Sequence, residues 1–145
     1  MSRSVAREMA FKILFQTDVG RNPWQEVLPR TLSETPLPDK SRLFLEELVK
    51  GTVKHLKEID EKIVKYAREW ALERMANTDR NILRLAIYEI QYMEDVPTGV
   101  SINEAVELAK KYGDVDSGKF VNGILGQIVK TPEVPEINKE DLTEV

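Results

Sequence analysis

Three residues near the C-terminus carry the side chains best suited to binding chemistry in this sequence. Lys119, Phe120 and Asn122 lie within four positions of one another. On a helix, Lys119 and Asn122 share one side and Phe120 lies beside them. A lysine can hold a phosphate, an amide can read the edge of a base, and an aromatic ring can stack on a base. The group favours RNA binding, but any amphipathic helix contains neighbours of these types.

Residues suited to catalysis or metal binding are few. The chain has one histidine, His55, and no cysteine, which excludes thiolate nucleophiles, His/Cys metal constellations and disulfides. Acidic pairs such as Glu46 and Glu47 are explained more simply by a solvated helix face than by acid–base catalysis. We therefore expect no enzymatic activity, no metal and no cofactor. The lack of cysteine also fits a reducing compartment, and we expect a cytoplasmic protein.

The segment 113–119, GDVDSGK, has the spacing of a phosphate-binding P-loop up to its lysine. The next residue is Phe120, where the motif needs a hydroxyl group for magnesium. The segment also follows a predicted helix and not a strand, and Asp114 and Asp116 would place negative charge where phosphate should bind. The sequence therefore argues against a nucleotide site here.

Glycines recur on the last predicted helix, at positions 118, 123 and 126. Each costs about 1 kcal/mol relative to alanine inside a helix. Either close approach of an outside backbone or ligand, or internal packing, would account for them, and the sequence does not distinguish the two.

Charge is unevenly distributed along the 145 residues. The formal net charge is −4, with 25 acidic residues against 21 lysines and arginines. Residues 131–145 contain five acidic residues and one lysine and so account for the whole net charge. We expect a charge-balanced domain over residues 1–130 and an acidic, disordered tail over 131–145. By its charge, this tail could occupy a basic surface and compete with RNA. No apolar run approaches the roughly 20 residues that a membrane span needs, so we expect no membrane contact.

Hydrophobic spacing predicts helices throughout and no sustained strand pattern, so the fold class is all-α, a single compact domain of about seven helices. The central one is 77–92, whose apolar residues cover more than one face, so that other helices pack around it. We expect N-caps at Asn22, in the 77–79 cluster and at Ser101. The predicted helices are 3–19, one that starts at Asn22–Pro23 and ends before Thr35, 39–57, 59–70, 77–92, one from Ser101 to Gly113, and 116–130.

Three ordered segments resemble the NusB family of transcription antitermination factors. They lie within residues 3 to about 130 and include a long closing block. The segments are ARE at 6–8 with FKILFQ at 11–16, DRNILRLAIYE at 79–89, and INEAVELAKKYG at 102–113 with SGKFVNGIL at 117–125. The same fold also occurs as the N-terminal domain of certain RNA cytosine methyltransferases. Because no β/α catalytic domain follows, we expect the stand-alone factor.

The resemblance implies a helical protein that pairs with NusE, a ribosomal protein of the small subunit. The pair would bind single-stranded boxA RNA of nascent ribosomal RNA leaders and, with other Nus factors, keep RNA polymerase from terminating. Carried over by position, the implied RNA surface comprises Arg3, Arg7, Asp116, Lys119, Phe120 and Asn122. The implied NusE surface comprises Phe15, Asp79 and Arg80.

Two departures from the family pattern affect these expectations. Family members often begin with a dense run of arginines, whereas this chain offers only Arg3 and Arg7. Fewer phosphate contacts mean weaker binding and a flatter salt dependence, and therefore greater reliance on NusE. Phe15 stands where a tyrosine is common, so a hydroxyl contact is absent there. An alternative remains open: a helical protein-interaction adaptor without direct RNA contact.

Overall fold

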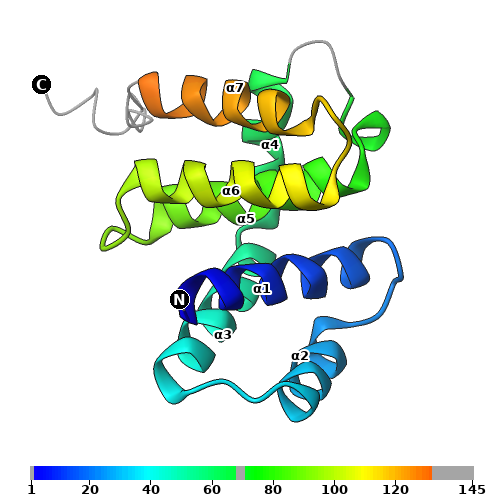
Figure 1. The fold of residues 1–145 in the computed structure, drawn as a ribbon. Helices are drawn as coiled ribbons and strands as arrows, with labels where there is room; N and C mark the ends of the chain where they lie inside the picture. Colours follow the sequence, from blue (N-terminus) through cyan, green and yellow to red (C-terminus); the bar gives the residue numbers. More distant parts are fainter. Residues whose placement is uncertain (1, 68–70, 132–145) are drawn as a thin grey trace, which may run out of the picture.

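The computed structural model describes residues 2–67 and 71–131, and all regular secondary structure in these ranges is helical (Figure 1). These residues form seven α-helices and one 3-10 helix, so the predicted all-α class and helix number are confirmed. The predictions for residues 132–145 and for Trp70 lie outside the described residues. The elements are α1 Ser2–Asp18, α2 Trp24–Glu34, α3 Asp39–Lys54, α4 Leu56–Tyr66, η1 Leu72–Arg74, α5 Asn77–Tyr92, α6 Thr98–Tyr112 and α7 Ser117–Lys130.

Helix α5 is the centre of the fold, as predicted from the apolar residues that cover more than one of its faces. It packs against α1, α3, α4, α6 and α7. Ile82, Leu83 and Ile87 are completely buried, and burying a side chain of this size contributes about 1.5–3 kcal/mol. One close approach requires glycine: a Cβ on Gly51 of α3 would lie 2.1 Å from Cζ of Tyr88. Tyr88 therefore fits against α3 only because no side chain stands there.

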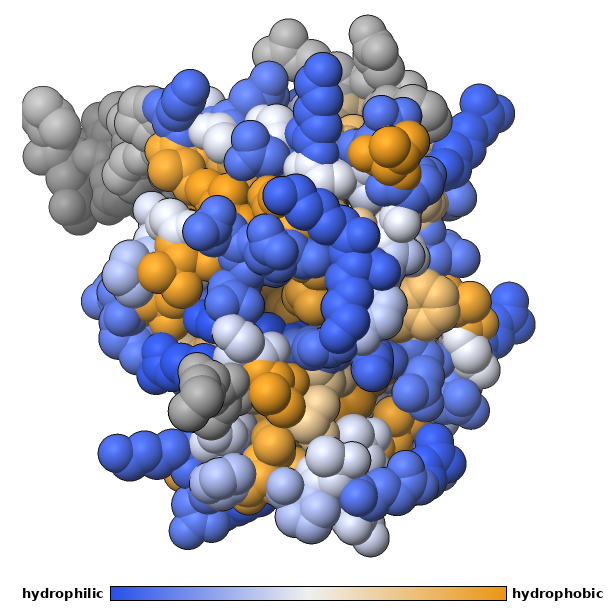
Figure 2. All heavy atoms as spheres, viewed as in Figure 1, coloured by the Kyte–Doolittle hydropathy of each residue, from blue (hydrophilic) through white to orange (hydrophobic). Residues whose placement is uncertain are grey.

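The helices fall into two groups joined through α5 and α6. Figure 1 shows α1, α2 and α3 together at one end of the molecule, with α4 and α7 toward the other. α6 packs against α7, α5 and α1, so it lies between the first and last helices. The face turned to the viewer in Figure 2 is mainly hydrophilic, and an apolar area lies beside the start of α1.

The predicted N-caps are wrong in three places, although α5 begins at Asn77 as predicted. α2 begins after Pro23 and α6 begins after Pro97, and no side chain caps either helix. Each proline already has the φ of a helix start, −59° and −58°, so a polar cap is not needed to begin the turn. Ser101 lies inside α6, where it is buried. α5 begins after Ala76, again without a side-chain cap.

No helix in the described part of the chain is both long enough and apolar enough to span a bilayer.

Candidate nucleic-acid and partner interface

The first turns of α7 present the side chains that the sequence singled out. Lys119 and Asn122 are exposed on one side of the helix. Phe120 is half-buried, and it packs against the hydrophobic core. Val121 and Ile124 point inward and fix the rotation of the helix, which turns the lysine and the amide to solvent. The structure therefore brings a cation, an amide and an aromatic ring together at one helix start.

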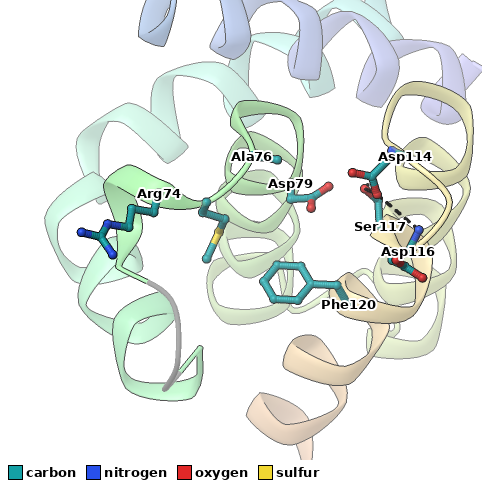
Figure 3. A pocket seen from close by; sticks show the side chains of 8 residues that line it. Arg74, Ala76, Asp79, Asp114, Asp116, Ser117 and Phe120 are labelled. Carbon is teal, nitrogen blue, oxygen red and sulfur yellow. Dashed lines mark hydrogen bonds between the residues drawn. The ribbon is translucent and has the colours of Figure 1, made fainter.

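Phe120 forms one wall of a pocket of about 360 Å³ between the starts of α5 and α7 (Figure 3). The other wall belongs to α5 and to the residues just before it. Figure 3 shows Asp79 directed across the pocket toward Asp114 and Ser117, whereas Arg74 extends away from them. The pocket is lined by Arg74, Met75, Ala76, Asp79, Asp114, Asp116, Ser117 and Phe120. Two residues expected on the RNA surface, Asp116 and Phe120, thus share a pocket with Asp79, which was expected on the partner surface.

Asp79 is the unusual group of this pocket. It is 7% exposed, and its Oδ1 atom has no hydrogen-bond partner. Burial raises the pKa of its carboxyl group above the ordinary value; the neighbouring Ser117 hydroxyl opposes this rise, and the nearby charge of Asp114 adds to it. A carboxylate buried with a free oxygen is costly unless a donor from outside fills the position. The pocket is therefore suited to a hydrogen-bond donor or a cation.

The segment between α6 and α7 holds its acidic groups by short local bonds. The Asp114 amide donates to Ser117 Oγ at 3.0 Å, and Ser117 Oγ donates to Asp114 Oδ1 at 3.2 Å. The Asp116 amide also donates to Asp114 Oδ1, at 3.2 Å. Asp114 and Ser117 were not among the residues expected at the site. Their spacing of three, before a helix, was the available signal. No cluster of three or more His, Cys, Asp or Glu in the described ranges could hold a metal ion.

The helical glycines of α7 divide into two kinds. A Cβ on Gly118 would lie 3.3 Å from Cγ of Lys110, so this glycine allows α6 and α7 to pack closely. A Cβ on Gly123 or Gly126 would meet nothing within 4 Å. Internal packing thus accounts for Gly118 and for neither of the other two.

The two arginines of α1 differ sharply in accessibility. The Arg3 side chain is 50% exposed and lies 3.3 Å from Asp95. Arg7 is 3% exposed. Its Nε donates to both carboxylate oxygens of Glu89, at 2.9 and 3.0 Å, and its Nη2 donates to Oε1 at 2.7 Å. This geometry is unfavourable to the RNA contact expected of Arg7, because its donors are turned inward; that contact stays a prediction.

The other two residues of the expected partner surface are also engaged inside the protein. Phe15 is half-buried, and its ring packs edge-on against Phe11 with centroids 6.0 Å apart. Arg80 donates from Nη2 to Asp18 Oδ2 at 2.6 Å and to Asn77 Oδ1 at 2.7 Å. Both side chains therefore have partners inside the protein, and direct contact with NusE stays a prediction for each.

The expected RNA residues do not form one continuous cluster. Arg3 lies at the beginning of α1, beside the α5–α6 connection that contains Asp95. Lys119 lies at the beginning of α7, beside the end of α6. Figure 1 places these two helix starts toward opposite ends of α6. A single RNA strand that contacts both would have to pass along the length of this helix.

Comparisons with known proteins agree with this architecture. A family model described as "NusB family" matches residues 4–130. The chain is 45% identical over 143 residues to "Transcription antitermination protein NusB" of Desulfitobacterium hafniense (strain DSM 10664 / DCB-2), covering 97% of this chain and 93% of that one.

Solved structures give the same result. The structure of T. maritima NusB superimposes with a TM-score of 0.83 at 39% identity, covering 97% of this chain and 96% of that one. A structure of antitermination factors NusB and NusE in complex with double-stranded RNA gives a TM-score of 0.81 at 32% identity, covering 89% and 96%. Because the family model covers residues 4–130 and these relatives are 32–45% identical over most of the chain, this chain belongs to the NusB family of transcription antitermination proteins.

Proposed function

We propose that this protein is a transcription antitermination factor that binds boxA RNA of nascent ribosomal RNA leaders together with NusE. In this role it supports processive transcription by RNA polymerase with the other Nus factors. It acts in the cytoplasm by binding and without catalysis. Family membership supports the role, and a relative of the same fold has been solved with NusE and RNA.

One observation carries the proposal for the site: Asp79, Asp116 and Phe120 line the same pocket, next to the exposed Lys119 and Asn122. RNA and protein partner would therefore meet at the junction of α5 and α7. In this arrangement Lys119 contacts a phosphate, Asn122 reads a base edge and Phe120 stacks on a base.

Asp116 borders the RNA surface, and its carboxylate can accept only from donors such as base amino groups. Arg3 supplies a second phosphate contact at the far end of α6. Arg7 acts mainly by position: its bonds to Glu89 join α1 to α5 and so hold Arg3 in place.

On the protein side, Asp79 is the anchor for NusE. Its unpaired Oδ1 would accept from a cationic side chain of NusE, which would remove the cost of burying that atom. Phe15 on α1 adds apolar contact area, and Arg80, held by Asp18, keeps the start of α5 in place.

The proposal for RNA is tested by Lys119→Glu, with Lys57→Glu on α4 as a control of equal charge change. Affinity for boxA and for a scrambled RNA is measured with and without NusE over a salt series. We expect Lys119→Glu to weaken boxA binding and to lower the salt slope by about 0.7, one phosphate contact on a single strand. Unaltered affinity, with the helical circular dichroism intact, would remove α7 from the RNA site.

The proposal for NusE is tested by Asp79→Lys, with Glu61→Lys on α4 as the matched control. The new charge would repel the cation that we assign to NusE, so association measured by calorimetry should be lost in the Asp79 variant alone. Association at the wild-type affinity would show that NusE binds elsewhere.

A second candidate is the helical adaptor without RNA contact. The burial of Arg7 and the acidic lining of the pocket favour it, because both reduce the positive charge available to RNA. An adaptor would show no preference for boxA over scrambled RNA and no salt slope of its own, so the titration above separates the two.

A further inference from the structure

A groove of about 540 Å³ lies at the end of the molecule where α1 begins. Three segments that are distant in sequence form it: the start of α1, the first turns of α3, and the connection between α5 and α6. The groove is lined by Arg3, Lys40, Ser41, Leu43, Phe44, Glu47, Met93 and Asp95.

The groove combines an apolar floor with a charged rim. Phe44 and Met93 are each 6% exposed and form the floor, whereas Leu43 is 57% exposed beside them. The Arg3 guanidinium lies 4.6 Å from the centroid of the Phe44 ring. Lys40 is exposed on the same side of α3. Glu47 and Asp95 line the groove as well and balance the two cations. A ligand with apolar side chains and carboxylates would pack on the floor and would take Arg3 and Lys40 as its partners in competition with these two residues.

The chain itself contains a segment of this kind. Residues 132–145 carry five acidic residues and one lysine, interleaved with apolar residues that include Ile137 and Leu142. The body of the chain has no net charge, so any attraction must come from a local patch and not from the domain as a whole.

The path from α7 to the groove is short. α6 and α7 lie side by side and run in opposite directions, so α7 ends beside the start of α6 (Figure 1). The start of α6 follows directly on the α5–α6 connection, which contributes Met93 and Asp95 to the groove. Residues 132–145 number 14 and, at about 3.3 Å each, span up to about 46 Å. A domain of this size is only about 36 Å across.

We propose that the groove binds the chain's own C-terminal segment, residues 132–145. An apolar side chain of the segment packs on Leu43, Phe44 and Met93, and its carboxylates pair with Lys40 and Arg3. Arg3 then exchanges Asp95, its present partner, for a carboxylate of the segment. The bound segment covers Arg3 and competes with RNA; this consequence, unlike the docking, rests on the proposed function.

Docking is tested first without RNA, in the full chain and in a chain ended after Thr131. Amide chemical shifts of the isotope-labelled proteins are compared at several concentrations. We expect differences at Leu43, Phe44 and Met93 that do not depend on concentration, and none at Lys119. No difference at the groove would overturn the proposal. So would a concentration-dependent difference, which would assign the groove to a second copy of the chain.

Two variants of the full chain separate docking from simple charge. The double change Ile137→Ser with Leu142→Ser keeps every charge of the segment but removes its largest apolar side chains. Lys40→Glu reverses a rim charge, and Lys50→Glu on the same helix is its control. We expect the double serine variant and Lys40→Glu to show the same amide chemical shifts at the groove residues as the shortened chain. Lys50→Glu should keep the shifts of the unaltered full chain. Wild-type shifts in the serine variant would overturn the proposal.

The consequence for RNA is measured with the same proteins. Ending the chain after Thr131 should raise affinity for single-stranded boxA RNA roughly three- to tenfold at low salt. The serine variant should show a comparable gain. If RNA affinity rises in the shortened chain but not in the serine variant, the segment acts through diffuse charge, and the docking proposal is overturned. If no form binds RNA, the proposed function fails, and the chemical shifts still decide whether the segment docks.

Discussion

A single buried carboxylate at the α5–α7 junction lowers the stability of the fold. Asp79 keeps a carboxylate oxygen unpaired among buried atoms, where most proteins would place an apolar or a satisfied group. Lys119 and Asn122, by contrast, are exposed on the first turns of α7, where an outside ligand can reach them.

Asp79→Asn should stabilise the protein at neutral pH, by on the order of 1 kcal/mol. The raised pKa of Asp79 means that the folded state prefers the protonated carboxyl group. The stability gained by protonation is fully present below the ordinary pKa of 3.8 and is lost as pH rises through the folded value. The advantage of the asparagine variant, measured by urea unfolding, should therefore be larger at pH 7 than at pH 4. An equal advantage at both values would contradict this account.

At the scale of elements, buried ion pairs decide how the helices are joined. Arg7 and Glu89 link α1 to α5, and Ser101 brings α6 into the same cluster by donating to Glu89 at 3.3 Å. On the other side of α5, Arg84 donates from Nε to Asp60 of α4 at 2.8 Å. These bonds are directional, so they fix the relative rotation of helices that apolar packing alone would leave freer.

Arg7→Met should destabilise the protein by about 3–5 kcal/mol, because Glu89 would remain buried without its partner. Adding Glu89→Met should recover most of this loss, since an apolar pair of similar size can replace a buried ion pair. Denaturant unfolding of both variants measures the difference. A double variant no more stable than the single one would show that the cluster is held by other bonds.

The same double variant addresses the role of Arg7 in RNA binding. If Arg7 makes no direct contact with RNA, the Arg7→Met, Glu89→Met double variant should bind boxA RNA with the wild-type affinity and the wild-type salt slope.

At the scale of the whole molecule, ion pairs between distant segments make stability depend on pH. Lys111 donates to Glu8 at 2.7 Å, and this bond, with another from Tyr112, lowers the pKa of Glu8 below its ordinary value. Burial opposes ionisation of Asp18, but the hydrogen bonds from Asn81 and Arg80 and the charge of Arg84 outweigh it, and the pKa of Asp18 is lowered. Both carboxylates join α1 to later helices.

We expect the free energy of unfolding to fall in acid. Because both pKa values are lowered on folding, the stabilisation is complete above the ordinary values of 4.5 and 3.8 and is lost as pH decreases through the folded values. Urea unfolding between pH 6 and pH 3 should show this loss, and Asp18→Asn with Glu8→Gln should flatten it. An unchanged slope in the double variant would assign acid sensitivity to other groups.

Much of this molecule was determined by its sequence alone. Hydrophobic spacing gave the all-α class and the central position of α5, because a helix that is apolar on several faces must be surrounded. The ordered 102–125 block indicated the family before any coordinates, since a long match rarely arises by chance.

Only the tertiary structure decided what each polar side chain does. Arg3 and Arg7 are four residues apart on one helix, yet Glu89, 82 positions away from Arg7, takes the second arginine out of solvent. Asp79 looked like a capping residue; the packing of α7 against α5 made it a buried carboxylate with an open position. Helical periodicity is local and can be read from neighbours, whereas burial and pairing depend on residues that meet only when the chain folds.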